Sequence, residues 1–213
     1  MNIYDKYGLI HTQDQETTGN GILFSVIYLL VCQRDEKLEA LCKSLWKEEL
    51  GVLWRNPDNT YGQESHDNYL ALGLLCLMTN DKIIPRQVIS SAISKFGFMW
   101  NVRGGEFWNS QMFRFPHIWL VFLAGAIGFK PVSWVLGLGL RFLNLFDRID
   151  MNDTSGIQLQ WVKQKALNYM GHNTLAPFYS KLGKPMSEVM SVYWVSGHPV
   201  LEGYKKDEET ILS

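Results

Sequence analysis

Three polar segments of the chain carry side chains that could do chemistry, and each directly precedes a strongly apolar run. They read HTQDQETTGN at residues 11–20, ESHDN at residues 64–68 and EFWNSQMFRFPH at residues 106–117. If the apolar runs are helices that point in the same direction, the segments at their N-terminal ends share one face. That face would gather polar and aromatic side chains, namely Asp14, Glu16, Asn20, His66, Asp67, Asn68, Trp108, Arg114 and His117, joined by Trp54 and Arg55 from the loop before residue 64.

The carboxylates on this face suggest acid/base chemistry. Glycoside hydrolysis uses two carboxyl groups that flank the scissile bond, and Asp67 with either Asp14 or Glu16 would form such a pair. Tryptophan rings beside them would stack on sugar rings. The side chains expected to bind the substrate are His66, Asn68, Trp54, Arg55, Trp108, Arg114 and His117.

Helix capping is the structural alternative for the same segments. Ser, Asp and Asn are favoured at helix N-caps, and acidic side chains there complement the helix dipole. Capping accounts for Ser65, Asp67 and Asp14. It gives no reason for His66, Arg114 and His117 to lie beside such apolar helices.

Other chemistries fit the sequence less well. His66-Asp67 has ligand types that suit a metal, but it precedes an apolar run, whereas in the HD-type metal phosphohydrolases the pair follows one. The chain has no GxSxG, GxGxxG or GxxxxGK[ST] motif, and two of its three cysteines lie inside apolar runs. We therefore expect no metal, no cofactor and no covalent nucleophile.

The elements that must position these residues are helices. Apolar or amphipathic helical patterns cover residues 21–33, 35–50, 66–78, 85–100, 116–129, 132–146, 153–169, 176–182 and 186–194. Very apolar helices alternate with amphipathic ones, which predicts an all-α fold of inner and outer helical hairpins, a partial α/α toroid. An irregular helical bundle is the alternative. Residues 1–202 are expected to form one domain, and residues 203–213 a flexible tail.

Composition limits the partners and the location. The 213-residue chain has a net charge of −1 and no basic stripe, which argues against nucleic-acid binding. Its first residues lack the pattern of a signal peptide, and Lys130-Pro131 cuts the longest apolar run too short to span a membrane. An odd number of cysteines without a CxxC motif implies no disulfides. We therefore expect synthesis in the cytoplasm and no membrane partner.

Two stretches carry a family resemblance. GLIHTQDQETTGNGILFSVIYLL (8–30) and RNPDNTYGQESHDNYLALGLL (55–75) resemble a group of uncharacterised proteins of tailed bacteriophages, with a TGNG-type helix start and a His-Asp start to a later apolar helix. The resemblance covers about the first eighty residues and implies a phage origin, synthesis in the host cytoplasm and a role in the virion or in host takeover. The toroid is also a common scaffold of carbohydrate-active enzymes, an analogy of fold alone.

Two hypotheses about function follow. In the first, the polar face binds or cleaves a bacterial surface glycan, as a glycoside hydrolase or lyase would. In the second, the protein is a non-enzymatic phage structural or interaction protein that binds a phage or host protein. The second hypothesis predicts an exposed apolar patch of more than a few hundred Å².

Overall fold

The structure is a computed structural model that describes residues 3–11, 19–58, 65–95, 116–146, 154–172, 194 and 196–212. In these ranges the elements are α1 (Gly21–Val31), α2 (Glu36–Ser44), β1 (Trp46–Lys47), β2 (Val52–Leu53), α3 (His66–Thr79), α4 (Ile83–Ser94), α5 (Pro116–Ile127), α6 (Lys130–Phe146), α7 (Thr154–Tyr169) and α10 (Pro199–Leu212). The all-α class predicted from the sequence is confirmed.

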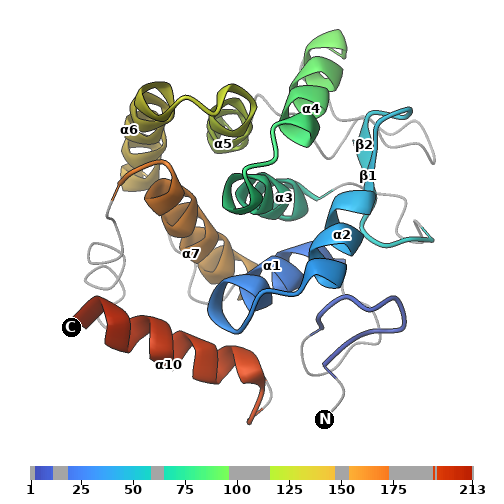
Figure 1. The fold of residues 1–213 in the computed structure, drawn as a ribbon, viewed down its shortest axis with the longest axis vertical. Helices are drawn as coiled ribbons and strands as arrows, with labels where there is room; N and C mark the ends of the chain where they lie inside the picture. The colour runs from blue at the N-terminus through green and yellow to red at the C-terminus, as the bar shows by residue number, and fades with distance from the viewer. Residues whose placement is uncertain are drawn as a thin grey trace.

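Helix α3 lies at the centre of the fold (Figure 1). It packs against α1, α5 and α7, and its residues 67–76 are all buried. Helix α1 is buried over residues 21–29, whereas α2 and α4 each bury only three residues. The predicted alternation of inner and outer helices therefore holds from α1 to α4. The toroidal arrangement stays a prediction.

Helices α1, α3 and α5 point in the same direction. The first turn of α3 is hydrogen-bonded to the first turn of α1 through Asn68. Further along α3, Gly73 lies against Val121 of α5, and Leu77 lies one turn later against Gly125. Because these contacts advance along both helices together, their N-terminal ends are at the same side of the molecule.

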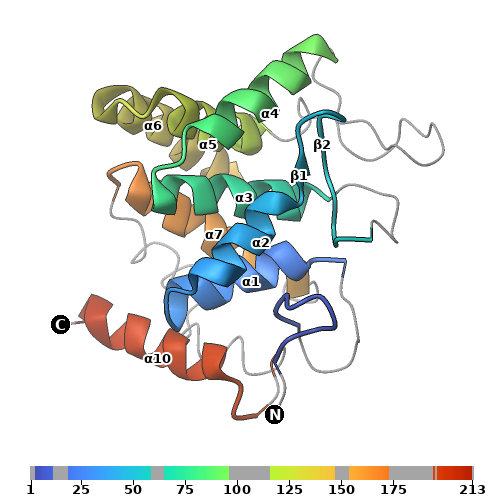
Figure 2. The same cartoon turned by 45° about the vertical axis from the view of Figure 1, so that its right-hand side comes forward.

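The helix expected over residues 35–50 is shorter in the structure. Asp35 caps it by accepting hydrogen bonds from the backbone N–H groups of Lys37 and Leu38, but α2 ends at Ser44. Strands β1 and β2 follow as an antiparallel hairpin at the edge of the fold (Figure 2). Its turn contains Gly51 at φ +62°, a left-handed conformation that suits glycine and ends a helical path.

Two further helix boundaries follow local chemistry. Helix α4 begins two residues before Pro85, because the Asp81 carboxylate accepts hydrogen bonds from the N–H groups of Ile83 and Ile84. Helix α7 ends at Tyr169 as expected. The end expected for α4 at residue 100 and the helices expected over residues 176–182 and 186–194 fall outside the described residues, apart from residue 194.

The hairpin of α5 and α6 divides the long apolar stretch of the sequence. The chain turns at Gly128, which adopts φ +61°, and Pro131 lies in the first turn of α6. Among the helices that the structure describes, none has the length and apolarity needed to cross a membrane.

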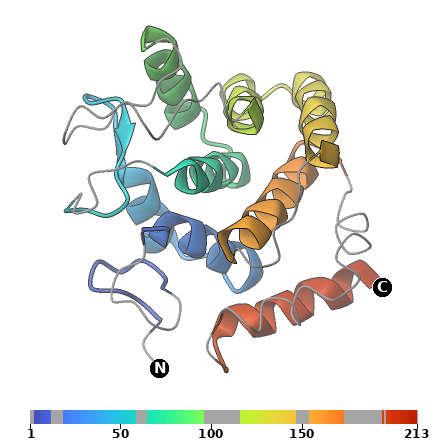
Figure 3. The ribbon, with the colours of Figure 1, turned by 180° about the vertical axis from the view of Figure 1, so that it is seen from behind.

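Helix α10 lies where a flexible tail was expected. It runs along α1, as the view from behind also shows (Figure 3). Gly203 sits against the backbone of Val31 at the end of α1, and Tyr204 is 1% exposed and packs edge-on against Trp161. The boundary expected at residue 202 thus falls inside a docked helix. The charged residues of this segment hid the contacts of Gly203 and Tyr204 in the sequence.

Candidate functional site

The described ends of the polar segments before α1 and α3, residues 19–20 and 65–68, lie together. Ser65 Oγ donates a hydrogen bond to Asn20 Oδ1 at 3.2 Å. Asn68 is 0% exposed; its Nδ2 donates to the carbonyl of Gly19 at 2.8 Å and its Oδ1 accepts from the N–H of Leu23 at 3.2 Å. Asn68 therefore joins the two helix ends, and the structure gives it a packing role.

His66 and Asp67 form a close pair in the first turn of α3. His66 Nε2 lies 2.7 Å from Asp67 Oδ1, with side-chain exposures of 37% and 9%. The Asp67 carboxylate is thus mostly buried and faces a neighbouring imidazole. Its expected catalytic partners, Asp14 and Glu16, lie outside the described residues.

The other predicted substrate-binding residues are placed in part. His117 lies in the first turn of α5, at the same side of the molecule as the start of α3. Trp54 is half-buried with the Lys47 ammonium 4.8 Å from its ring centroid, and Arg55 lies so close over Gly19 that a Cβ there would meet its guanidinium. Trp108 and Arg114 fall outside the described residues.

A cavity of about 580 Å³ lies at the opposite end of α3. Four segments converge there: the end of α3, the turn between α5 and α6, the first turns of α6 and the end of α7. None of the predicted site residues lines it. The sequence carried a weak signal for it in the small residues at positions 124, 125, 128 and 171, but nothing in the sequence shows that these helix ends converge.

The walls of this cavity are mainly apolar, with one fixed aromatic ring. The Trp134 indole stacks on His172 with ring centroids 5.2 Å apart and 16° between the planes. His172 Nε2 also lies 2.8 Å from the Trp134 carbonyl, which holds the imidazole in place. Tyr169 stands at the end of α7, and burial raises the pKa of its hydroxyl.

Two reactive groups that line the cavity are unsuited to catalysis. Burial raises the pKa of the Cys76 thiol to about 12, so it does not form a nucleophilic thiolate at neutral pH. Burial also acts to raise the pKa of Asp81, but hydrogen bonds from Lys43 and from the N–H of Ile83 outweigh it and the pKa is lowered. Asp81 is therefore ionised at neutral pH, and its carboxylate forms an ion pair with the Lys43 ammonium at 3.0 Å.

Helix α6 presents a second notable surface on its outer side. Five apolar side chains on it are between 42% and 73% exposed, namely Trp134, Val135, Leu138, Phe142 and Leu145. The last four are spaced by three, four and three residues, which is the a/d spacing of a helix that packs against another helix. On the opposite side, Leu140 is 0% exposed and faces the core.

Comparisons with known proteins add no assignment to these features. The chain matches no family model, no curated protein and no solved structure. In the described part of the chain, no group of three or more His, Cys, Asp or Glu side chains is placed to hold a metal ion. The function must therefore be argued from the geometry.

Proposed function

We propose that the protein is a non-enzymatic interaction protein that binds an acidic amphipathic helix of a partner along the outer face of α6. The observation that carries the proposal is the row of exposed side chains Val135, Leu138, Phe142 and Leu145 at a/d spacing. Together with Trp134 they form a contiguous row of exposed apolar side chains on one helix, and contiguous exposed apolar patches often mark protein-binding sites.

The charges of α6 favour an acidic partner. The helix has no acidic residue and carries Lys130 and Arg141, both exposed. No carboxylate among the described residues lies within salt-bridge distance of either side chain. Glutamates that flank the apolar seam of a partner helix would meet these cations.

A second copy of the chain fits this face less well. In an antiparallel pair of α6 helices, the flanking position of Arg141 faces the same position of the other copy, so two like charges approach each other. The resemblance to phage proteins makes a second phage protein or a host protein the natural source of the partner helix.

The test uses two synthetic helical peptides with leucine at a and d. One has glutamate at e and g, and the other has lysine at the same positions. We expect fluorescence anisotropy to show binding of the glutamate peptide, weaker binding at high salt, and little binding of the lysine peptide.

A matched pair of variants locates the binding. Phe142→Asp should abolish it, whereas Ile93→Asp should not, because Ile93 is a 64% exposed apolar residue on α4 away from this face. Equal binding of both peptides, no effect of Phe142→Asp, or a dimer of the free protein in sedimentation that Phe142→Asp dissolves would contradict the proposal.

Binding or cleavage of a bacterial glycan at the polar face is our second proposal. It is supported by the common direction of α1, α3 and α5, which brings His66, Asp67 and His117 to one side of the molecule. A screen of bacterial surface polysaccharides should show turnover that Asp67→Asn abolishes while circular dichroism stays unchanged. Turnover by Asp67→Asn at the native rate would exclude Asp67 as the acid or base.

A further inference from the structure

We infer that the cavity at the C-terminal end of α3 is a binding site for a small aromatic carboxylate, with the carboxylate held by Lys130 and the aromatic body between α5, α6 and α7. This inference does not rest on the proposed function of the outer face of α6, although Trp134 borders both surfaces. The site would give the protein a small-molecule ligand as well as a protein partner.

The size and the lining suit a small apolar body. A volume of about 580 Å³ lies inside the range of small-ligand sites. Leu77, Ala124 and Met170 make apolar walls, and Gly125 and Gly171 contribute backbone to the lining.

The aromatic preference comes from Trp134. One face of its indole is covered by His172, which holds the ring in a fixed orientation. The residue is still 47% exposed and lines the cavity, so its indole offers rigid aromatic surface to a ligand. A flat ring can pack against this wall with little loss of conformational freedom.

The charged groups that line the cavity favour an anionic ligand. The Asp81 carboxylate is neutralised by Lys43, and the last carbonyls of α3 and α7 accept backbone hydrogen bonds, for example Cys76 from Asp81 and Leu167 from His172, both at 2.9 Å. Of the two charged side chains that line the cavity, Asp81 and Lys130, Lys130 has no ion-pair partner among the described residues, and it stands at the positive end of the α6 dipole.

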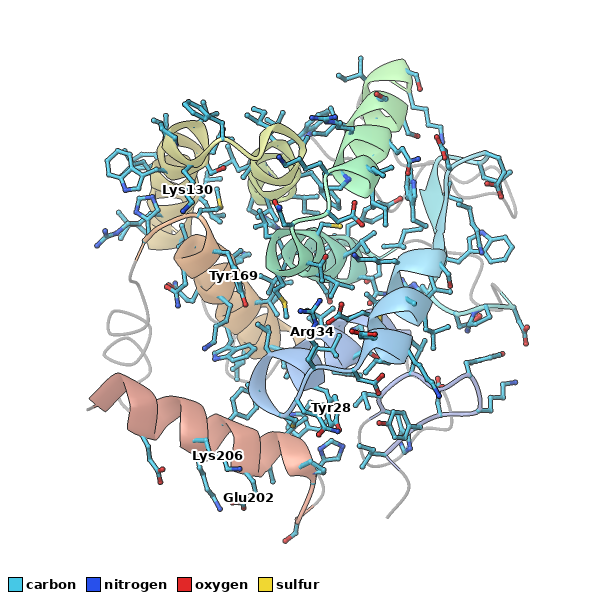
Figure 4. The ribbon with its side chains drawn as sticks, in the orientation of Figure 1. Tyr28, Arg34, Lys130, Tyr169, Glu202 and Lys206 are labelled. Carbon is cyan, nitrogen blue, oxygen red and sulfur yellow. The ribbon has the colours of Figure 1, made fainter. Side chains whose placement is uncertain are left out.

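A second donor lines the same cavity. Lys130 is at the start of α6 and Tyr169 at the end of α7, and both line the cavity (Figure 4). A tyrosine hydroxyl ordinarily has a pKa of about 10, and burial raises the pKa of Tyr169 further, so the hydroxyl is protonated at neutral pH and can donate a hydrogen bond. A single carboxylate matches one ammonium and one hydroxyl, whereas a nucleotide or polyphosphate would leave most of its charge unmatched.

The experiment is calorimetric titration of the full chain with three probes. They are 1-naphthylacetate, its neutral amide 1-naphthylacetamide, and decanoate. We expect the amide to bind roughly ten-fold or more weakly than the acid, since it loses a charge-assisted contact. Decanoate should also bind more weakly than the aromatic acid.

Variants at exposed positions test the role of the cation. Lys130→Gln should remove the preference for acid over amide, Lys130→Arg should keep it, and Arg141→Gln, a charge loss elsewhere on α6, should not change it. Phe142→Asp should leave binding of the acid intact even where it abolishes peptide binding, so that failure of one proposal is distinct from failure of the other.

Three results would overturn the inference. They are no binding of 1-naphthylacetate at millimolar concentration, equal affinity for acid and amide in the native protein, and an acid preference that survives Lys130→Gln. Tighter binding of decanoate than of 1-naphthylacetate would overturn the aromatic assignment.

Discussion

The protein is expected to lose stability in mild acid because of one buried histidine, His198. This residue directly precedes α10, is 2% exposed, and accepts a hydrogen bond at Nδ1 from the N–H of Val200 at 3.2 Å. Its ring packs 4.4 Å from that of Trp194, measured between centroids. Burial, with a smaller contribution from the charge of His11, lowers the pKa of His198 from 6.5 to about 4.

The direction and size of the effect follow from proton linkage. Between pH 6.5 and pH 4 the unfolded chain binds a proton at His198 that the folded chain does not bind, so the free energy of unfolding falls as the pH falls. A pKa difference of this size corresponds to about 3 kcal/mol in full and to about 2 kcal/mol at pH 5. Asp81 affects stability only at lower pH. Its pKa in the folded protein is lowered, so it loses its stabilising negative charge only below the pH range in which a carboxyl group ordinarily titrates.

The assay is urea unfolding followed by tryptophan fluorescence at pH 7 and pH 5. His198→Asn is the matched control: asparagine retains an acceptor near the position of Nδ1 and is a favoured N-cap residue, but it does not titrate. We expect the native chain to lose about 2 kcal/mol of unfolding free energy between these pH values and the variant to lose much less. An equal loss in both proteins would refute the assignment to His198.

Three further predictions concern packing and reactivity. Gly203→Ala should lower the free energy of unfolding in urea by roughly 1–3 kcal/mol, because a Cβ at this position would meet the backbone of α1. Gly197→Ala is the control: it has open space around it and should cost only about 1 kcal/mol, for its φ of +81°. Equal losses in the two variants would contradict the contact between Gly203 and α1. Asn68→Ala should lower the free energy of unfolding by roughly 1–3 kcal/mol in the same assay, since it leaves the N–H of Leu23 and the carbonyl of Gly19 without their partner. An unchanged stability would show that water replaces the amide. At pH 8 Ellman's reagent should label Cys32 before Cys42, because Cys42 is buried. Burial also raises the pKa of Cys42 to about 12, compared with about 11 for Cys32. Equal labelling rates would contradict this order and would mean that the helices open together.

The candidate site shows how far sequence reasoning reached. The premise that alternate helices share a direction brought the segments before α1 and α3 together, and Ser65, Asn20 and Asn68 do meet there. The sequence could not show that Asn68 would be used for packing. Amide and carboxylate side chains at a helix start serve capping, packing and ligand binding equally well, and only their neighbours in space distinguish these uses.

The outer face of α6 shows a second limit. Its apolar residues gather on one side, but the pattern does not say whether that side packs on the fold or faces outward. The structure buries Leu140 against the fold and leaves Phe142 61% exposed. The choice depends on which side of α6 packs against α5 and α7, and the pattern along α6 alone does not specify this.

The sequence by itself determined the helical class, the buried character of α1 and α3, and the end of α7. It did so because an all-round apolar segment must be covered, and because caps and glycine turns act through neighbouring residues. Only the tertiary structure decided the convergence that forms the cavity, the docking of α10 on α1, and the exposure of α6. These depend on which surfaces meet, and apolar burial is non-directional, so a pattern along the chain specifies that a face is buried without specifying its partner.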